Sequence, residues 1–185
     1  MEIDINQQAI AIGDKYKIFT DGQQTHTASK GIFQLLAEIN LFDNSNGRPR
    51  MAINKRFAWF KAKYDITRWD NVIYQFRTVS YWRPHYQCRC GNDTYDIYAH
   101  SGRKYSIYKN GKQVAWWNKK AVTWFDGDNY NMLADKDCDA NLLISFCLII
   151  DNFSSNDERN KNTVNFNFGN IFQAKKFDEN WQPKY

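Results

Sequence analysis

The sequence has little of what marks several common protein classes. Only 3 of its 185 residues are proline and 9 are glycine, which excludes collagen-like and low-complexity chains. No uninterrupted apolar stretch reaches the roughly 18–20 residues that a helix needs to span a bilayer. The first residues, MEIDINQQAI, are acidic and polar and do not resemble a signal peptide. We therefore expect a cytoplasmic protein with reduced thiols, and attachment to a membrane surface stays open.

The motifs of common catalytic and metal-binding sites are also missing. No serine-centred elbow, Walker loop or HExxH pattern is present. His26, His85 and His100 lie in unrelated segments, and we expect each to be hydrogen-bonded or exposed. One residue separates Cys88 from Cys90, whereas a zinc half-site has roughly two to four between its ligands. We expect a protein that is not an enzyme and that holds no metal and no cofactor.

Aromatic residues are abundant, at 17% of the chain, and they favour half-buried strands. Short alternating segments separated by turn residues indicate an antiparallel sandwich or barrel. The clearest hairpin turn is Asn110-Gly111, because both central positions of a type I′ turn require positive φ. We predict strands over residues 15–20, 32–42, 49–57, 58–68, 71–79, 84–90, 94–99, 104–109, 112–118 and 129–135. A helix is the alternative over 32–42, and the turn residues 43–47 that follow favour the strand.

The pattern changes after the last of these strands. Residues 140–150, ANLLISFCLII, are apolar on every side, and a helix of this kind must be buried all round. Asp139 suits the N-cap of such a helix. We predict a buried helix over about 139–151, although a central strand is an alternative because of its β-branched residues. A polar loop over 152–163 and a possible extra strand over 164–172 follow.

Charge is unevenly distributed along the chain, whose net charge is +5. Residues 45–120 carry 16 basic and 4 acidic side chains, and the segments on either side are net acidic. A block this basic is compatible with an anionic partner such as phospholipid or nucleic acid. The alternative is that lysines and arginines only keep the outer faces of strands soluble and discourage edge pairing.

A basic and aromatic stripe is the best candidate site. On a single strand, Lys55, Phe57, Trp59, Lys61 and Lys63 would share one face, because side chains two residues apart point the same way. Lysines attract phosphate head groups, and tryptophan suits a membrane–water interface. Lys119 and Lys120 extend the candidate head-group site, and Trp59 is its candidate interface aromatic. An ordinary solvated strand is the alternative.

Four segments, in this order, resemble the tubby C-terminal-like superfamily and especially its LURP-one-related and YxjI-like branch. They are DKYKIFTDG, LFDNSNGRPRMAINKRFAWFKAKYDIT, KYSIYKNGKQVAWWNKKAVTWFDGDNYNM and ANLLISFCLIIDN. The resemblance implies a closed antiparallel barrel of about twelve strands around a buried hydrophobic C-terminal helix. It gives a barrel domain over 1–152 and a C-terminal extension over 153–185. Related tubby and scramblase proteins imply action at membranes, but no ligand residue is transferred.

Three functions are compatible with these features. The first is a binding module for anionic phospholipid or phosphoinositide head groups, peripheral to the membrane. The second is a structural or protein-interaction domain that contacts a protein partner, or a second copy of itself, through the C-terminal tail. The third is nucleic-acid binding through the basic middle segment, which no RNP, zinc-finger or helix-turn-helix pattern supports.

Overall fold

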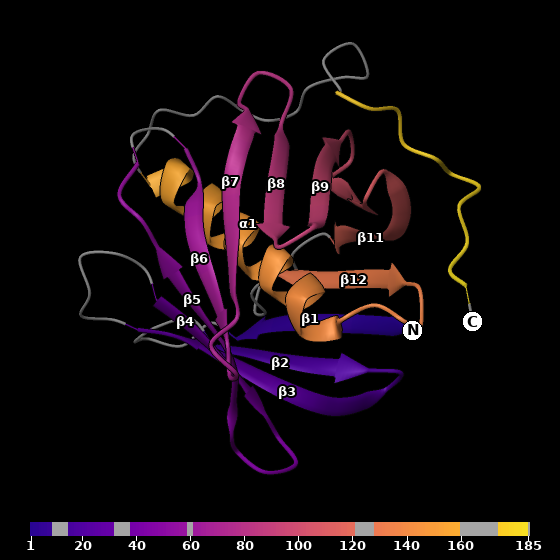
Figure 1. Cartoon of the computed structure of the whole chain (residues 1–185). Coiled ribbons are helices and arrows are strands. Elements are labelled where there is room, and N and C mark those ends of the chain that lie inside the picture. Colours follow the sequence, from indigo (N-terminus) through magenta and orange to yellow (C-terminus); the bar gives the residue numbers. More distant parts are fainter. Residues whose placement is uncertain (9–14, 32–37, 59–60, 121–127, 160–173, 185) are drawn as a thin grey trace.

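The fold is a closed antiparallel barrel of twelve strands with one helix inside it (Figure 1). The computed structural model describes residues 1–8, 15–31, 38–58, 61–120, 128–159 and 174–184. The strands are β1 (Glu2–Gln8), β2 (Lys15–Thr20), β3 (Gln23–Lys30), β4 (Glu38–Asp43), β5 (Pro49–Lys55), β6 (Lys63–Arg68), β7 (Ile73–Ser80), β8 (His85–Cys90), β9 (Asp93–His100), β10 (Lys104–Lys109), β11 (Lys112–Lys120) and β12 (Asn129–Ala134). Neighbours in sequence pair with one another, and β1 pairs with β12 to close the barrel.

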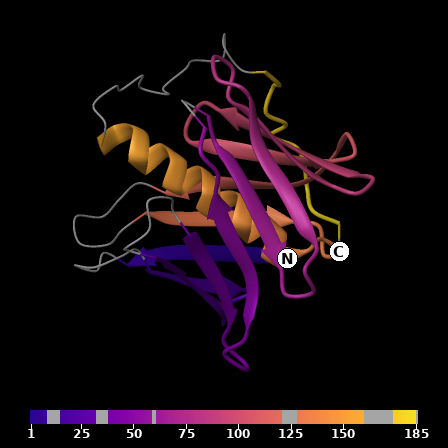
Figure 2. The same ribbon diagram turned by 60° about the vertical axis from the view of Figure 1, so that its left-hand side comes forward.

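The helix α1 (Ala140–Arg159) runs through the interior, as both views show (Figures 1 and 2). Its apolar residues from Leu142 to Ile150 are almost fully buried. Alternate strand residues point inward to meet them, as in β7, where every second residue is buried. Phe146 shows the contact: its ring lies 5.9 Å from that of Phe76 and 5.6 Å from that of Tyr95. The predicted fold class is confirmed, and the buried strand alternative for residues 140–150 is wrong.

Local sequence signals set the start of α1 and the turn between β10 and β11. Asp139 caps α1 as predicted, because its Oδ1 accepts hydrogen bonds from the backbone N–H groups of Asn141 at 3.0 Å and Leu142 at 3.3 Å. The Asn110-Gly111 turn joins β10 to β11 with φ of 49° and 84°, as a type I′ turn requires. These two features were readable from sequence because each depends on neighbouring residues alone.

The predicted elements need correction at three points. The sequence analysis missed β1 and β3. β3 (QQTHTASK) is polar, and only Ala28 in it is buried. The strand predicted over 58–68 begins only at Lys63. Of the strand predicted over 32–42, the described part from Glu38 onward is a strand, and residues 32–37 lie outside the described residues. The loop predicted from residue 152 is wrong as far as Arg159, because α1 continues to that residue and meets no proline or glycine. The strand predicted over 164–172 lies outside the described residues.

Because α1 fills the barrel, shortening a side chain at its centre should leave a cavity. Replacing Phe146 by alanine should lower the free energy of unfolding by about 3–5 kcal/mol, measured by urea denaturation. Phe57→Ala is the matched control, since that ring is 76% exposed and its loss should change stability by no more than about 0.5 kcal/mol. Equal effects of the two substitutions would contradict the enclosed position of α1.

Candidate functional site

Two loops meet at the barrel end toward which α1 runs. One loop joins β5 to β6, and the other joins β7 to β8 at the upper end of the view (Figure 1). The first is closed by a hydrogen bond from Arg56 N–H to the Lys63 carbonyl, at 2.8 Å. Ala62 then ties it to β7: its N–H donates to Thr78 Oγ1 at 2.8 Å, and its carbonyl accepts from Thr78 N–H at 2.8 Å. These bonds place Lys61 beside the residues that follow Thr78.

Large apolar side chains are exposed on both loops and at the end of β7. Phe57 is 76% exposed, Trp82 is 75% exposed and Val79 is 46% exposed. The rings of Tyr81 and Trp82 pack edge to face with centroids 6.3 Å apart, so the second loop presents two neighbouring aromatic rings. Exposure of several large apolar groups on adjacent loops is a feature of surfaces that meet another apolar phase or a partner.

Basic side chains surround these apolar groups, and acidic ones are missing. Segments 55–63 and 77–85 contain no aspartate or glutamate. They supply Lys55, Arg56, Lys61, Lys63, Arg77 and Arg83. Arg56 pairs with Asp65 at 3.2 Å, and Arg77 donates to Gln87 Oε1 at 3.1 Å. Within the described part of the chain, Lys61, Lys63 and Arg83 have no acidic partner. We call the set Phe57, Lys61, Lys63, Arg77, Val79, Trp82 and Arg83 the basic rim.

The structure divides the stripe that the sequence predicted. Lys55 and Lys63 were expected on one face of one strand, but residues 56–62 separate β5 from β6. Lys55 lies opposite the inward-facing, buried Tyr64 and is half-buried, whereas Lys63 lies opposite the exposed Arg77. Directly paired residues lie on the same face of a sheet, and consecutive residues of one strand lie on opposite faces. Lys55 is therefore on the inner face with Tyr64, and Lys63 is on the outer face with Arg77. Trp59 lies outside the described residues, and Lys61 is exposed.

Lys119 and Lys120 are placed differently from the rim lysines. They lie at the same end of the barrel but on β11, and both have acidic partners. Lys119 forms an ion pair with Asp128, and its Nζ lies 3.9 Å from Asp151 Oδ1 inside the barrel. Lys120 Nζ lies 3.7 Å from Asp4 Oδ1. The structure thus gives Lys119 an interior contact at the C-terminal half of α1.

Asp151 is the centre of a buried polar cluster at this end. It is 4% exposed, and it accepts hydrogen bonds from Tyr16 at 2.7 Å and from Tyr130. Burial raises the pKa of its carboxyl, and the tyrosine hydroxyls and Lys119 act against that rise. The next residue, Asn152, donates to Tyr64 Oη at 2.9 Å. The cluster fixes the emerging part of α1 to β2, β6 and β12 behind the basic rim.

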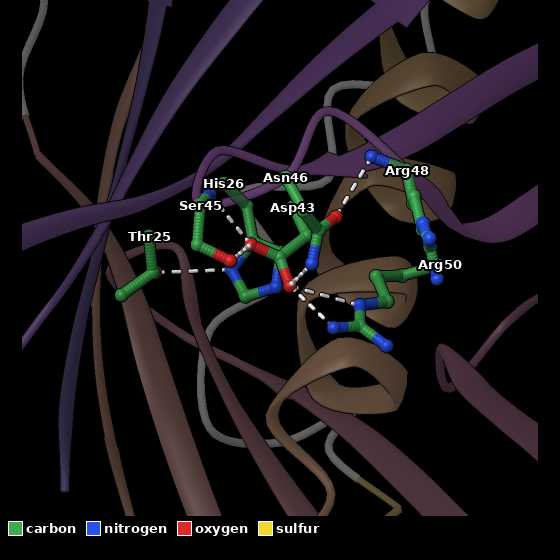
Figure 3. Close-up of polar contacts among 7 residues, drawn as sticks. All are labelled: Thr25, His26, Asp43, Ser45, Asn46, Arg48 and Arg50. Atoms are coloured by element: carbon green, nitrogen blue, oxygen red, sulfur yellow. Dashed lines mark hydrogen bonds and ion pairs between the residues drawn. The ribbon is translucent and has the colours of Figure 1, made fainter.

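A second polar cluster, drawn in Figure 3, lies at the opposite end of the barrel. It borders an open hollow of about 450 Å³. His26 Nδ1 lies 2.9 Å from Thr25 Oγ1, and burial lowers the pKa of this histidine. The carboxylate of Asp43 accepts hydrogen bonds from Ser45 Oγ at 2.6 Å and from Arg50 Nε at 3.0 Å. Both bonds lower the pKa of Asp43, and the bond from Ser45 has the larger effect. Both carboxylate oxygens of Asp43 therefore hold the β4–β5 turn.

The remaining histidines have partners, as the sequence led us to expect. His85 Nε2 lies 2.8 Å from Asp96 Oδ1, and the buried His100 has its Nε2 2.7 Å from Ser106 Oγ. Among the described residues no group of three or more histidine, cysteine, aspartate or glutamate side chains is arranged to hold a metal ion. Asp135, the first of an acidic run before α1, accepts a hydrogen bond from the N–H of Lys184 at 2.6 Å.

Sequence reasoning missed the half of the basic rim that β7 and its following turn supply. Arg77, Val79, Trp82 and Arg83 lie some twenty residues after Lys61, and only the β6–β7 pairing brings them beside it. The sequence did contain a usable signal. Segment 77–85, which includes the turn Tyr-Trp-Arg-Pro, has no acidic residue, and neither has segment 55–63. Strand adjacency had to be assumed before the two segments could be joined.

Comparison with known proteins gives one match. A family model described as LURP-one-related matches residues 1–151, which contain all twelve strands and most of α1. No curated protein and no solved structure matched the chain. In the described ranges, no helix combines the length and hydropathy of a membrane span. The match ends before the C-terminal tail.

The buried carboxyl of Asp151 should make stability depend on pH. Because its pKa is raised in the folded state, the folded protein holds a proton that the unfolded chain loses near pH 3.8. Stability from this group is full below that pH and falls as the pH rises through the raised pKa, by at most about 1.4 kcal/mol per pH unit.

Urea unfolding across pH 4–8 tests this. Asp151→Asn should remove that part of the slope, whereas Asp137→Asn, which changes an exposed carboxylate before α1, should keep the wild-type profile. Parallel profiles for the wild type and Asp151→Asn would show that the carboxyl does not titrate differently on folding.

Proposed function

The chain belongs to the LURP-one-related family, and on that premise we propose that it is a non-enzymatic binding module whose basic rim docks on anionic phospholipid surfaces. The observation that carries the proposal is the composition of the rim. Exposed Phe57 and Trp82 stand among cations that have no acidic partner within the described residues. Negative lipid head groups would supply the missing counter-charge, and the rings would enter the interface between head groups and acyl chains.

Comparison of the two barrel ends supports the choice of site. The opposite end also exposes a tryptophan, Trp69, which is 67% exposed. There, however, Arg68 is neutralised by Asp70 and Arg50 by Asp43, and Arg48 is left as an exposed arginine without an ion pair among the described residues. Trp69 thus stands between the two members of an ion pair, which attracts an anionic surface less than unpaired cations do. The combination of rings and unneutralised cations is found on the basic rim.

The proposal narrows the residues expected to contact head groups. Lys61 and Lys63 are retained from the sequence prediction, and Arg77 and Arg83 join them. Lys119 has interior acidic partners, so its replacement should affect stability before it affects binding. Lys55 is the last residue of β5 and precedes Trp59 in the sequence by four positions. Trp59 remains a predicted interface residue.

Co-sedimentation with liposomes tests the proposal. Vesicles of phosphatidylcholine alone, with graded phosphatidylserine, and with a phosphoinositide should be compared at low and high salt. We expect salt-sensitive binding to both anionic compositions, because exposed charges are screened by salt. A stronger response to the phosphoinositide at equal total charge would indicate recognition of a particular head group, and equal responses would indicate a response to charge alone. Absence of binding at low salt would contradict the proposal.

Two sets of variants separate the charged and aromatic contributions. Lys61→Glu with Lys63→Glu should weaken binding by about 30-fold or more, since each surface cation contributes about 1 kcal/mol. Trp82→Ala should weaken the part of binding that survives high salt. The matched controls are Lys17→Glu, an exposed lysine on β2, and Trp69→Ala at the other barrel end. If the controls weaken binding as much as the rim variants, the site assignment is wrong.

A further inference from the structure

Part of the outer wall of the barrel is buried although it faces away from α1. On β10, Ile107 points into the barrel, so its neighbours Ser106 and Tyr108 point outward. Ser106 is nevertheless 0% exposed and Tyr108 is 7% exposed. His100 on β9, paired with Lys104, is 7% exposed as well. A segment outside the barrel must therefore cover this wall.

The covering segment is the C-terminal tail, residues 174–184, seen as the yellow trace beside β9 and β11 (Figure 1). Lys175 Nζ lies 3.8 Å from the centroid of the Tyr108 ring and 5.6 Å from that of Tyr98. Both are cation–π contacts, which gain strength where water is excluded. Lys175 thus binds an aromatic pair on β9 and β10.

Phe177 contacts the part of the wall next to this pair. Its ring centroid lies 5.1 Å from that of His100 and 5.5 Å from that of Trp116, both in edge-on geometry. Lys104 Nζ lies 4.9 Å above the same ring. The spacing Lys-x-Phe therefore matches two adjacent subsites, one that takes a cation and one that takes an aromatic ring.

A backbone anchor completes the binding at the far end of the tail. Lys184 N–H donates to Asp135 Oδ1 at 2.6 Å, and the Lys184 carbonyl accepts from Lys136 N–H at 3.0 Å. Pro183 beside it is buried. Backbone pairing combined with side-chain pockets is the usual way in which a folded domain recognises an extended peptide. We call the wall formed by Tyr98, His100, Lys104, Tyr108, Trp116 and Asp135 the tail groove.

The tail is an addition to a barrel that is already complete. All twelve strand pairs close without it, and the family match ends at residue 151. Fourteen residues, 160–173, separate it in sequence from Arg159 at the end of α1. A chain of that length can span at most about 50 Å, so covalent reach allows the tail to leave its own barrel for another.

We propose that the tail groove is a peptide-recognition site whose ligand is the Lys-x-Phe tail, and that the groove of one copy binds the tail of a second copy. Each contact that the tail makes in its own barrel is available to an identical tail from a neighbour, as in exchange of an element between protomers. Intramolecular binding dominates in dilute solution because the attached tail has a high effective concentration. Exchange then increases with protein concentration, independently of the basic rim.

A labelled peptide of residues 174–185 tests the groove in the full-length chain. The receptor is the variant Lys175→Ala/Phe177→Ala, whose own tail is weakened and whose groove is intact. Fluorescence anisotropy should show saturable binding to this variant, and at least about tenfold weaker binding to the wild type, where the attached tail competes. A peptide with Lys176→Ala should still bind, since Lys176 is exposed, whereas peptides with Lys175→Ala or Phe177→Ala should not.

Exchange between copies is tested by complementation. The receptor variant is mixed with Trp116→Ala, which weakens the groove and leaves the tail unchanged. In sedimentation velocity the mixture should contain a species heavier than either variant alone, because the tail of one variant occupies the groove of the other. Cooperative thermal unfolding of the receptor variant would show that it is folded. If the peptide does not bind this folded variant, the groove assignment is overturned. If the peptide binds but the mixture forms no heavier species, exchange between copies is overturned.

Discussion

Enclosure of one apolar helix is the constraint on which the rest of the structure depends. A helix with Leu, Ile, Phe and Cys on every side cannot lie on a surface, because each of its faces must leave water. The closed barrel satisfies this requirement with one inward row of side chains from each strand, and closure also removes exposed sheet edges. The interior is then filled by α1, so the ends and the outer wall of the barrel are the surfaces left to contact another molecule.

Both candidate surfaces follow from this arrangement. The helix needs a capped start and a fixed exit, which Asp139 and Asp151 provide at opposite ends. The loops at the barrel end where Asp151 lies do not take part in the strand pairing that closes the barrel. Two of them carry rings and cations of the basic rim. The outward-facing side chains of β9–β11 likewise do not pack against α1. Aromatic residues among them form the tail groove.

Sequence patterns predicted the fold to the extent that local features decide it. The apolar run with Asp139 before it gave the helix and its start, and Asn110-Gly111 gave a hairpin, because each depends on adjacent residues. The barrel itself needed the family resemblance. β3 was missed because its buried face offers only Ala28, and the end of α1 was missed because polar residues after Ile150 look like a loop in sequence. The site was less predictable, since strand pairing brings Lys61 beside Val79 and divides Lys55 from Lys63.

Hydrogen–deuterium exchange of the full chain with and without anionic liposomes tests the proposed docking surface most directly. Proximity of the basic rim to the membrane predicts slower amide exchange confined to the loops that follow β5 and β7, with β9–β11 unchanged. Slower exchange over β9–β11 or β2–β3 with no change in these two loops would contradict docking through the basic rim.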